Sequence, residues 1–123
     1  MRVIVAGSRN CPKLDYVRQA LDKSPFYMDE LVSGGARGVD TFGEMIANEK
    51  RIKIRRFPAD WNRFGKSAGY RRNEEMATYA DALVAVWDGQ SVGTKHMIDI
   101  ARNHHIPVYI FKYNPVDANK VMR

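Results

Sequence analysis

The segment SGGARGVD at residues 33–40 has the composition of a loop that approaches an anion. Three of its residues are glycines, which let a backbone turn sharply and lie close to a ligand. Arg37 adds a planar, permanently charged guanidinium suited to phosphate or carboxylate. A short apolar run precedes the loop and an amphipathic segment follows it, so the N-terminus of a helix would point at the ligand. The sequence therefore predicts a site for a phosphate-bearing small molecule.

Two further turns carry small or polar residues after apolar runs. In the first, Gly7 permits close approach, Ser8 can donate a hydrogen bond, and Arg9 can pair with an anion. The alternative is a plain turn from strand to helix. In the second, the segment SVGT at residues 91–94 would open a helix and form another phosphate cradle. Two such helix starts together predict a nucleotide site more specifically than either does alone.

A third region, residues 60–73, supplies an aromatic ring and several cations. Trp61 would either stack on a base or fill the core. Arg71, Arg72 and Asn73 would lie early in a helix and face the ligand, or belong to a solvated helix face. Asp40, at the start of its own helix, would either cap that helix or accept a hydrogen bond from a ribose hydroxyl.

Taken together, these segments define the candidate site. The residues predicted to bind the ligand are Gly7, Ser8, Arg9, Gly34, Gly35, Ala36, Arg37, Gly38, Asp40, Asp60, Trp61, Arg71, Asn73, Asp88, Ser91, Gly93 and Thr94. No metal-ligand spacing is present in the sequence, so neither a metal nor a cofactor is expected.

Five apolar runs, at residues 3–6, 31–32, 52–57, 82–87 and 107–111, alternate with segments of helical periodicity. This alternation is typical of repeated βα units with right-handed crossovers. We predict one α/β domain, Rossmann-like and doubly wound, over residues 1–113, with about five parallel strands in the order 3-2-1-4-5. Its ligand would bind where the strand order reverses, beside the first and fourth strands. Residues 114–123 would form a loosely attached tail.

Composition limits the classes of function. The chain has 123 residues, enough for one domain, and 45% of them are hydrophobic. No apolar run approaches the ~18 residues of a membrane span, and the N-terminal run is too short for a signal peptide. With Cys11 as the single cysteine, the expected location is cytoplasmic. The net charge of +6 is spread over scattered residues, so we expect no nucleic-acid partner.

Five segments in this order resemble the YspA-like proteins of the SLOG superfamily, relatives of the Lonely Guy phosphoribohydrolases. They are MRVIVAGSR at 1–9, SGGARGVD at 33–40, PADW at 58–61, AGYRRNEEM at 68–76 and SVGT at 91–94. The resemblance covers about residues 1–112. It implies a Rossmann-like fold, a homo-oligomer that is commonly a dimer, and binding of nucleotides or NAD-derived molecules. Some members hydrolyse nucleoside monophosphates to free base, and others sense ligands.

The resemblance also identifies a departure at one functional position. The phosphoribohydrolases carry an Arg-Lys-x-x-Met motif, which Arg72 matches, so Arg72 is the candidate catalytic residue. Their Pro-Gly-Gly-x-Gly-Thr-x-x-Glu motif ends in a catalytic glutamate, and Met97 stands in that place here. A thioether can neither stabilise an oxocarbenium-like charge nor activate water. The sequence therefore favours a binding or sensing module for a nucleotide or an ADP-ribose derivative, with N-glycosidic hydrolysis as the alternative.

Overall fold

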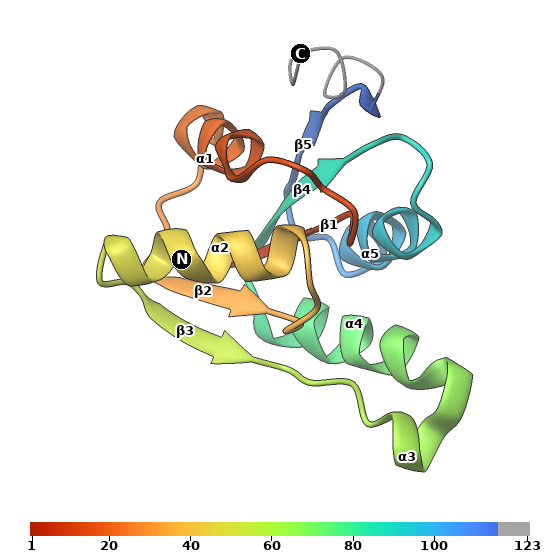
Figure 1. Cartoon of the computed structure of the whole chain (residues 1–123). Helices are drawn as coiled ribbons and strands as arrows, with labels where there is room; N and C mark the ends of the chain where they lie inside the picture. Colours follow the sequence, from red (N-terminus) through yellow and green to blue (C-terminus); the bar gives the residue numbers. More distant parts are fainter. Residues whose placement is uncertain (116–123) are drawn as a thin grey trace.

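A computed structural model of the chain describes residues 1–115 and contains one parallel β-sheet with helices on both faces (Figure 1). Its five strands pair in the order β3-β2-β1-β4-β5, which confirms the predicted doubly wound arrangement. The strands are β1 (Arg2–Gly7), β2 (Glu30–Ser33), β3 (Lys53–Arg56), β4 (Ala82–Trp87) and β5 (Val108–Lys112). The predicted C-terminal tail lies mostly outside the described residues.

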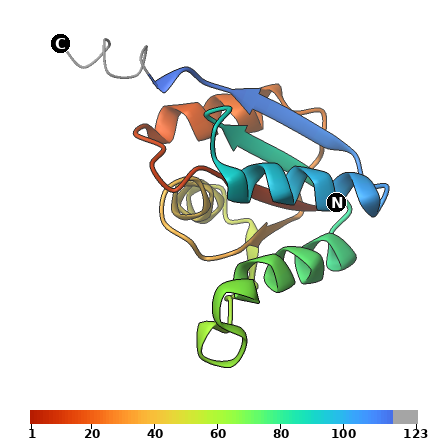
Figure 2. The same ribbon diagram turned by 90° about the vertical axis from the view of Figure 1, so that its right-hand side faces the viewer.

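The connections between strands are helical. The helices are α1 (Leu14–Lys23), α2 (Val39–Glu49), α3 (Trp61–Phe64), α4 (Ala68–Tyr79) and α5 (Val92–Asn103), with a 3-10 turn η1 (Gly65–Ser67) before α4. The sequence did not predict α3. The Asp60 carboxylate caps this short helix by accepting from the Arg63 N–H, and Gly65, at a φ of 56°, ends it. The segment with α3 extends away from the sheet in both views (Figures 1 and 2).

Alternation along the strands produces two apolar cores, one on each face of the sheet. On one face, Val3 and Val5 of β1 pack with Val17 of α1 and Ile46 of α2. On the other face, Ile4 of β1 belongs to a cluster that includes residues of α4 and α5. The central strands β1 and β4 are almost wholly buried because helices cover both of their faces.

The order of the strands reverses between β1 and β4, which pair in register from Val3 opposite Ala82 to Gly7 opposite Val86. The chain leaves β1 toward α1 on one face and leaves β4 toward α5 on the other face (Figure 1). This divergence opens a crevice at the carboxyl ends of the two strands, where ligands bind in folds of this kind. Within residues 1–115, no helix combines the length and apolarity needed to cross a membrane.

Candidate functional site

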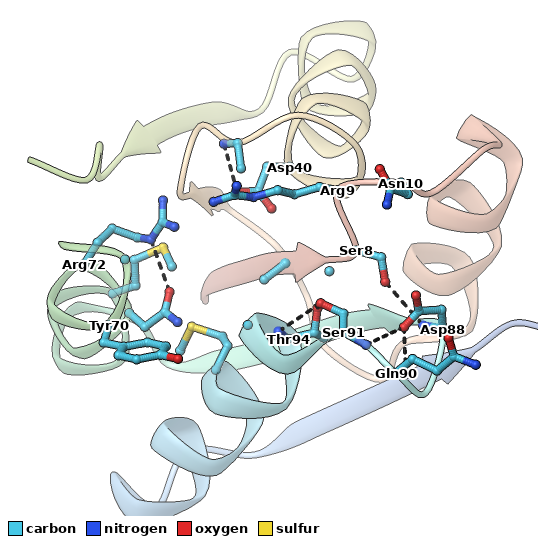
Figure 3. Close-up of a pocket in the computed structure, with 18 of the residues that line it drawn as sticks. Ser8, Arg9, Asn10, Asp40, Tyr70, Arg72, Asp88, Gln90, Ser91 and Thr94 are labelled. Atoms are coloured by element: carbon cyan, nitrogen blue, oxygen red, sulfur yellow. Dashed lines mark hydrogen bonds between the residues drawn. The ribbon is translucent and has the colours of Figure 1, made fainter. Parts of the chain in front are cut away.

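A cavity of about 550 Å³ lies at the carboxyl ends of β1 and β4 (Figure 3). The loop after β1, the glycine loop of residues 33–40 after β2, and the segments that begin α4 and α5 all contribute to its wall. The predicted residues that line it are Gly7, Ser8, Arg9, Ala36, Asp40, Trp61, Arg72, Asn73, Asp88, Ser91, Gly93 and Thr94. The two glycine-bearing turns therefore face one common space.

A second cavity of about 510 Å³ adjoins the first and shares four lining residues with it: Arg9, Ala36, Trp61 and Arg72. It is here that Gly34, Gly35 and Arg37 of the glycine loop are found. We call the larger space cavity 1 and the second space cavity 2. The sequence predicted one site, whereas the fold divides the predicted residues between two connected spaces.

Three predicted residues line neither cavity. The peptide of Gly38 packs against the loop after β1, where a Cβ atom would lie 2.4 Å from the Ser8 carbonyl oxygen. Asp60 caps α3, and Arg71 donates to Ser67 Oγ and lies over the ring of Phe64. In this structure the three residues therefore have local structural roles.

Two backbone N–H groups of the glycine loop are occupied by the protein's own side chains. Gly35 N donates to Ser33 Oγ, and Ala36 N donates to Asp40 Oδ2, each over 3.1 Å. The second bond shows that Asp40, at the start of α2, holds the glycine loop rather than the first turn of its own helix. Burial raises the pKa of Asp40 to about 6, although the Ala36 N–H and the nearby Arg72 oppose the shift.

Arg72 connects α4 to the glycine loop, and its neighbour Asn73 connects α4 to α5. Its Nη1 donates to the carbonyl oxygen of Gly34 over 2.6 Å, and its Nε donates to Asn73 Oδ1 over 3.2 Å. The Asn73 amide in turn lies 3.1 Å from His96 Nδ1, and because its oxygen accepts from Arg72, its nitrogen must donate to that ring. Burial lowers the pKa of His96, which favours the neutral ring that can accept this bond.

The start of α5 has backbone N–H groups with no intrahelical acceptor, and its residues Gly93 and Thr94 line cavity 1. Ser91 Oγ caps the helix by accepting from Thr94 N, which leaves the N–H groups of Val92 and Gly93 without an intrahelical acceptor. Asp88 holds the preceding turn by accepting from the N–H groups of Gln90 and Ser91 (Figure 3). Burial raises the pKa of Asp88, but those hydrogen bonds outweigh it, so the pKa is lowered overall.

The loop after β1 is joined to this turn. Ser8 is buried, and its Oγ accepts from the Asp88 N–H over 3.3 Å (Figure 3). Arg9 is exposed and extends across the mouth of the cavity toward the glycine loop (Figure 3). The sequence left open whether residues 7–9 form a plain strand-to-helix turn or part of the ligand site. In the structure they form such a turn, and they also line cavity 1.

Trp61 is not part of the core, so that alternative is wrong. Its side chain is 50% exposed and lines both cavities, because the short α3 carries it outside the two apolar clusters. Met97, by contrast, is buried and contributes its thioether to the wall of cavity 1. The wall of cavity 1 is therefore apolar at Met97.

Sequence reasoning missed several residues that line cavity 1. They are Ala6, Asn10, Lys66, Gly69, Tyr70, Met76 and Gln90. Tyr70 was accessible to prediction, because it lies three residues before Asn73 and therefore on the same face of α4. Asn10 and Lys66 gave no such signal, since Asn10 lies in the loop after β1 and Lys66 in the short 3-10 turn η1, which is too brief for a periodic pattern. Within residues 1–115, no three His, Cys, Asp or Glu side chains are grouped so that they could hold a metal ion.

Comparisons with known proteins agree with this architecture. The chain is 36% identical over 124 residues to the Gene 61 protein of Mycobacterium phage D29, a match that covers 93% of this chain and 98% of that protein. Its fold is similar to the X-ray structure of DNA processing protein A (DprA) from Streptococcus pneumoniae, with a TM-score of 0.73 and 19% identity. That match covers 89% of this chain and 49% of the other, so the chain spans about half of that protein. A family model matches residues 1–64, and the chain belongs to the family that it describes, the YspA, cpYpsA-related SLOG family.

Proposed function

We propose that the protein binds a phosphate-bearing nucleotide, or a small molecule derived from NAD or ADP-ribose, as a sensing or sequestering module. The observation that carries this proposal is that the start of α5 and the glycine loop line one cavity at the switch point of the sheet. A space of about 550 Å³ falls within the usual range for small-molecule sites.

The start of α5 is the proposed contact for a phosphoryl group. The N–H groups of Val92 and Gly93 lie in the first turn of a twelve-residue helix, where the helix dipole also favours an anion. The glycine loop would contribute mainly side-chain charge, because the amides of Gly35 and Ala36 are already bonded. Asp40 and Asn73 would accept from or donate to ribose hydroxyls, and Trp61 would flank a base.

A charge placed at the start of α5 tests the proposal. Gly93 has no φ in the left-handed region, and a Cβ there meets no atom within 4 Å, so Gly93→Asp is compatible with the fold. Its carboxylate would be stabilised by the helix dipole but would repel a phosphate. Isothermal titration with adenosine monophosphate and with ADP-ribose should give an affinity lowered by roughly tenfold or more, about 1.4 kcal/mol.

The matched control is Gly93→Asn, which has the same size but no charge. It should lose much less affinity than Gly93→Asp for each nucleotide. Equal losses in the two variants would mean that the effect is steric and that no anion lies at this helix. If the unsubstituted protein binds neither nucleotide, the proposed ligand class is wrong.

Hydrolysis of the N-glycosidic bond is the function that this site supports less well. Met97 supplies no carboxylate, and Arg72, the matched catalytic position, is engaged with Gly34 and Asn73. We expect chromatography to detect no free base after incubation with common nucleoside monophosphates or NAD. Release of base at a rate that depends on protein concentration would replace the binding proposal with an enzymatic one.

The remaining parts of the proposal concern location and partners. We propose a cytoplasmic homo-oligomer, a dimer or higher, which light scattering coupled to gel filtration would measure. We also retain the expectation that nucleic acid is not a partner, although the structural neighbour is titled a DNA processing protein. A gel shift of single-stranded DNA that weakens steeply with salt would contradict that expectation.

A further inference from the structure

Cavity 2 differs from cavity 1 in its charge. Four arginines line it, namely Arg9, Arg37, Arg56 and Arg72, and none of its lining residues is acidic. Cavity 1 instead includes the carboxylates of Asp40 and Asp88 as well as cations. A group that is both compact and strongly anionic therefore suits cavity 2 better than it suits most of cavity 1.

Not all of this positive charge is available to a ligand. Arg56 is neutralised by Glu44, with contacts of 2.7 and 2.8 Å to one carboxylate oxygen. Arg72 is held by Gly34 and lies near Asp40. Over the part of the chain that the structure describes, the side chains of Arg9 and Arg37 make no hydrogen bond or ion pair, and both are exposed, although Asp40 attracts Arg9 at longer range. Two guanidinium groups thus remain to bind an anion.

The two cavities are adjacent rather than independent. Arg9, Ala36, Trp61 and Arg72 form part of both walls, so a single ligand can extend from one space into the other. A phosphoryl group at the start of α5 would lie in cavity 1, because Gly93 and Thr94 line only that space. An anionic group in cavity 2 would then be a second one.

We propose that cavity 2 is a subsite for a second phosphoryl group, and that the ligand is therefore a nucleotide with a diphosphate rather than a monophosphate. This inference rests on the proposed function, since it assumes that the first phosphoryl group lies at α5. The guanidinium of Arg37 binds the second phosphoryl group, and Arg9 lies between the two groups. Guanidinium forks suit phosphate oxygens because they can donate two parallel hydrogen bonds.

Titrations of adenosine monophosphate and adenosine diphosphate test the subsite. The variant is Arg37→Gln, which removes an exposed charge with no protein partner in the described chain and should leave the fold intact. The control is Arg51→Gln, another exposed arginine, which lies between α2 and the amino end of β3, at the other end of the strands from the cavities, and lines neither of them. We expect Arg37→Gln to lower affinity for the diphosphate by about tenfold and for the monophosphate by less than about threefold. Arg51→Gln should change neither.

The outcomes separate this inference from the proposed function. If Arg37→Gln weakens both nucleotides equally, or neither, cavity 2 does not select a second phosphoryl group, while nucleotide binding still stands. If the unsubstituted protein binds neither nucleotide, both proposals fail. If an oligothymidylate binds more tightly than adenosine diphosphate and this binding requires Arg37, the arginines bind a nucleic-acid backbone. The diphosphate assignment is then overturned.

Discussion

Arg72 donates through Nη1 to the carbonyl oxygen of Gly34 over 2.6 Å, although the two residues are 38 positions apart in the chain. This bond fastens α4 to the glycine loop after β2. Gly34 is buried, and a Cβ atom there would lie 2.5 Å from the same guanidinium nitrogen. The geometry of the loop therefore depends on a side chain from another element.

Removal of that side chain should loosen the loop. Arg72→Ala leaves the buried Gly34 oxygen without its donor, and we expect it to lower the free energy of unfolding by about 1–3 kcal/mol. The neighbouring Arg71→Ala is the control, because Arg71 is exposed and loses only surface contacts, a hydrogen bond to Ser67 Oγ and its position over the Phe64 ring, about 1 kcal/mol or less. Urea denaturation measures both. Equal losses would mean that the bond to Gly34 adds no stability.

The pH dependence of the free energy of unfolding should reflect the raised pKa of Asp40. Its pKa is about 6 in the folded state, against an ordinary value of 3.8, so the folded protein keeps the proton to higher pH than the unfolded chain does. Stability from this group is complete below pH 3.8 and is lost as the pH rises through 6. Asp40→Asn removes the titration but keeps an acceptor for Ala36 N. As the pH rises from 3.5 to 7, the free energy of unfolding of Asp40→Asn should increase by about 3 kcal/mol relative to that of the unsubstituted protein.

Asp88→Asn provides the opposite comparison. The pKa of Asp88 is lowered in the folded state, so its charged form stabilises the protein above the ordinary pKa of 3.8, and this contribution disappears as the pH falls. As the pH rises, the free energy of unfolding of Asp88→Asn should therefore fall relative to that of the unsubstituted protein, which is the opposite of the trend for Asp40→Asn. Denaturation curves that show the same trend for both variants would contradict the assigned shifts.

Two glycines should respond differently to the same substitution. Gly38 has a φ of 77°, and its Cβ would lie 2.4 Å from the Ser8 carbonyl oxygen, so Gly38→Ala should cost about 2 kcal/mol or more. Gly93 meets nothing within 4 Å and lies in a helix, so Gly93→Ala should leave stability unchanged or raise it by up to about 1 kcal/mol. Thermal unfolding compares them. A stable Gly38→Ala protein would show that the two loops can separate.

Trp61 should affect binding without affecting folding. It is half exposed and lies outside both apolar clusters, so Trp61→Ala should change the free energy of unfolding by less than about 0.5 kcal/mol. If its ring stacks on a base, the same change should weaken nucleotide binding by about 1–3 kcal/mol, and Trp61→Phe should restore most of the loss. Titration calorimetry with adenosine monophosphate measures this. An unchanged affinity in Trp61→Ala would mean that the Trp61 ring does not contact the nucleotide.

Much of this architecture was predictable because the relevant signals are local. Continuous apolar runs at residues 3–6 and 82–87 identified strands buried on both faces, and both are central in the sheet. Right-handed crossovers then leave few topologies, and the observed order is the predicted one. The α3 helix was missed because four residues are too few for a periodic pattern, and with it the exposure of Trp61.

What the sequence determined by itself was the set of strands, their order, the family, and the segments at the switch point. These follow from periodicity, turn chemistry and motif order, which are properties of contiguous residues. Only the tertiary structure decided that Gly34 and Gly93 face different cavities, that Asp40 occupies the Ala36 amide, and that Arg72 reaches the glycine loop. Such facts depend on how loops from distant parts of the chain meet across the edge of the sheet, and no local pattern encodes those distances.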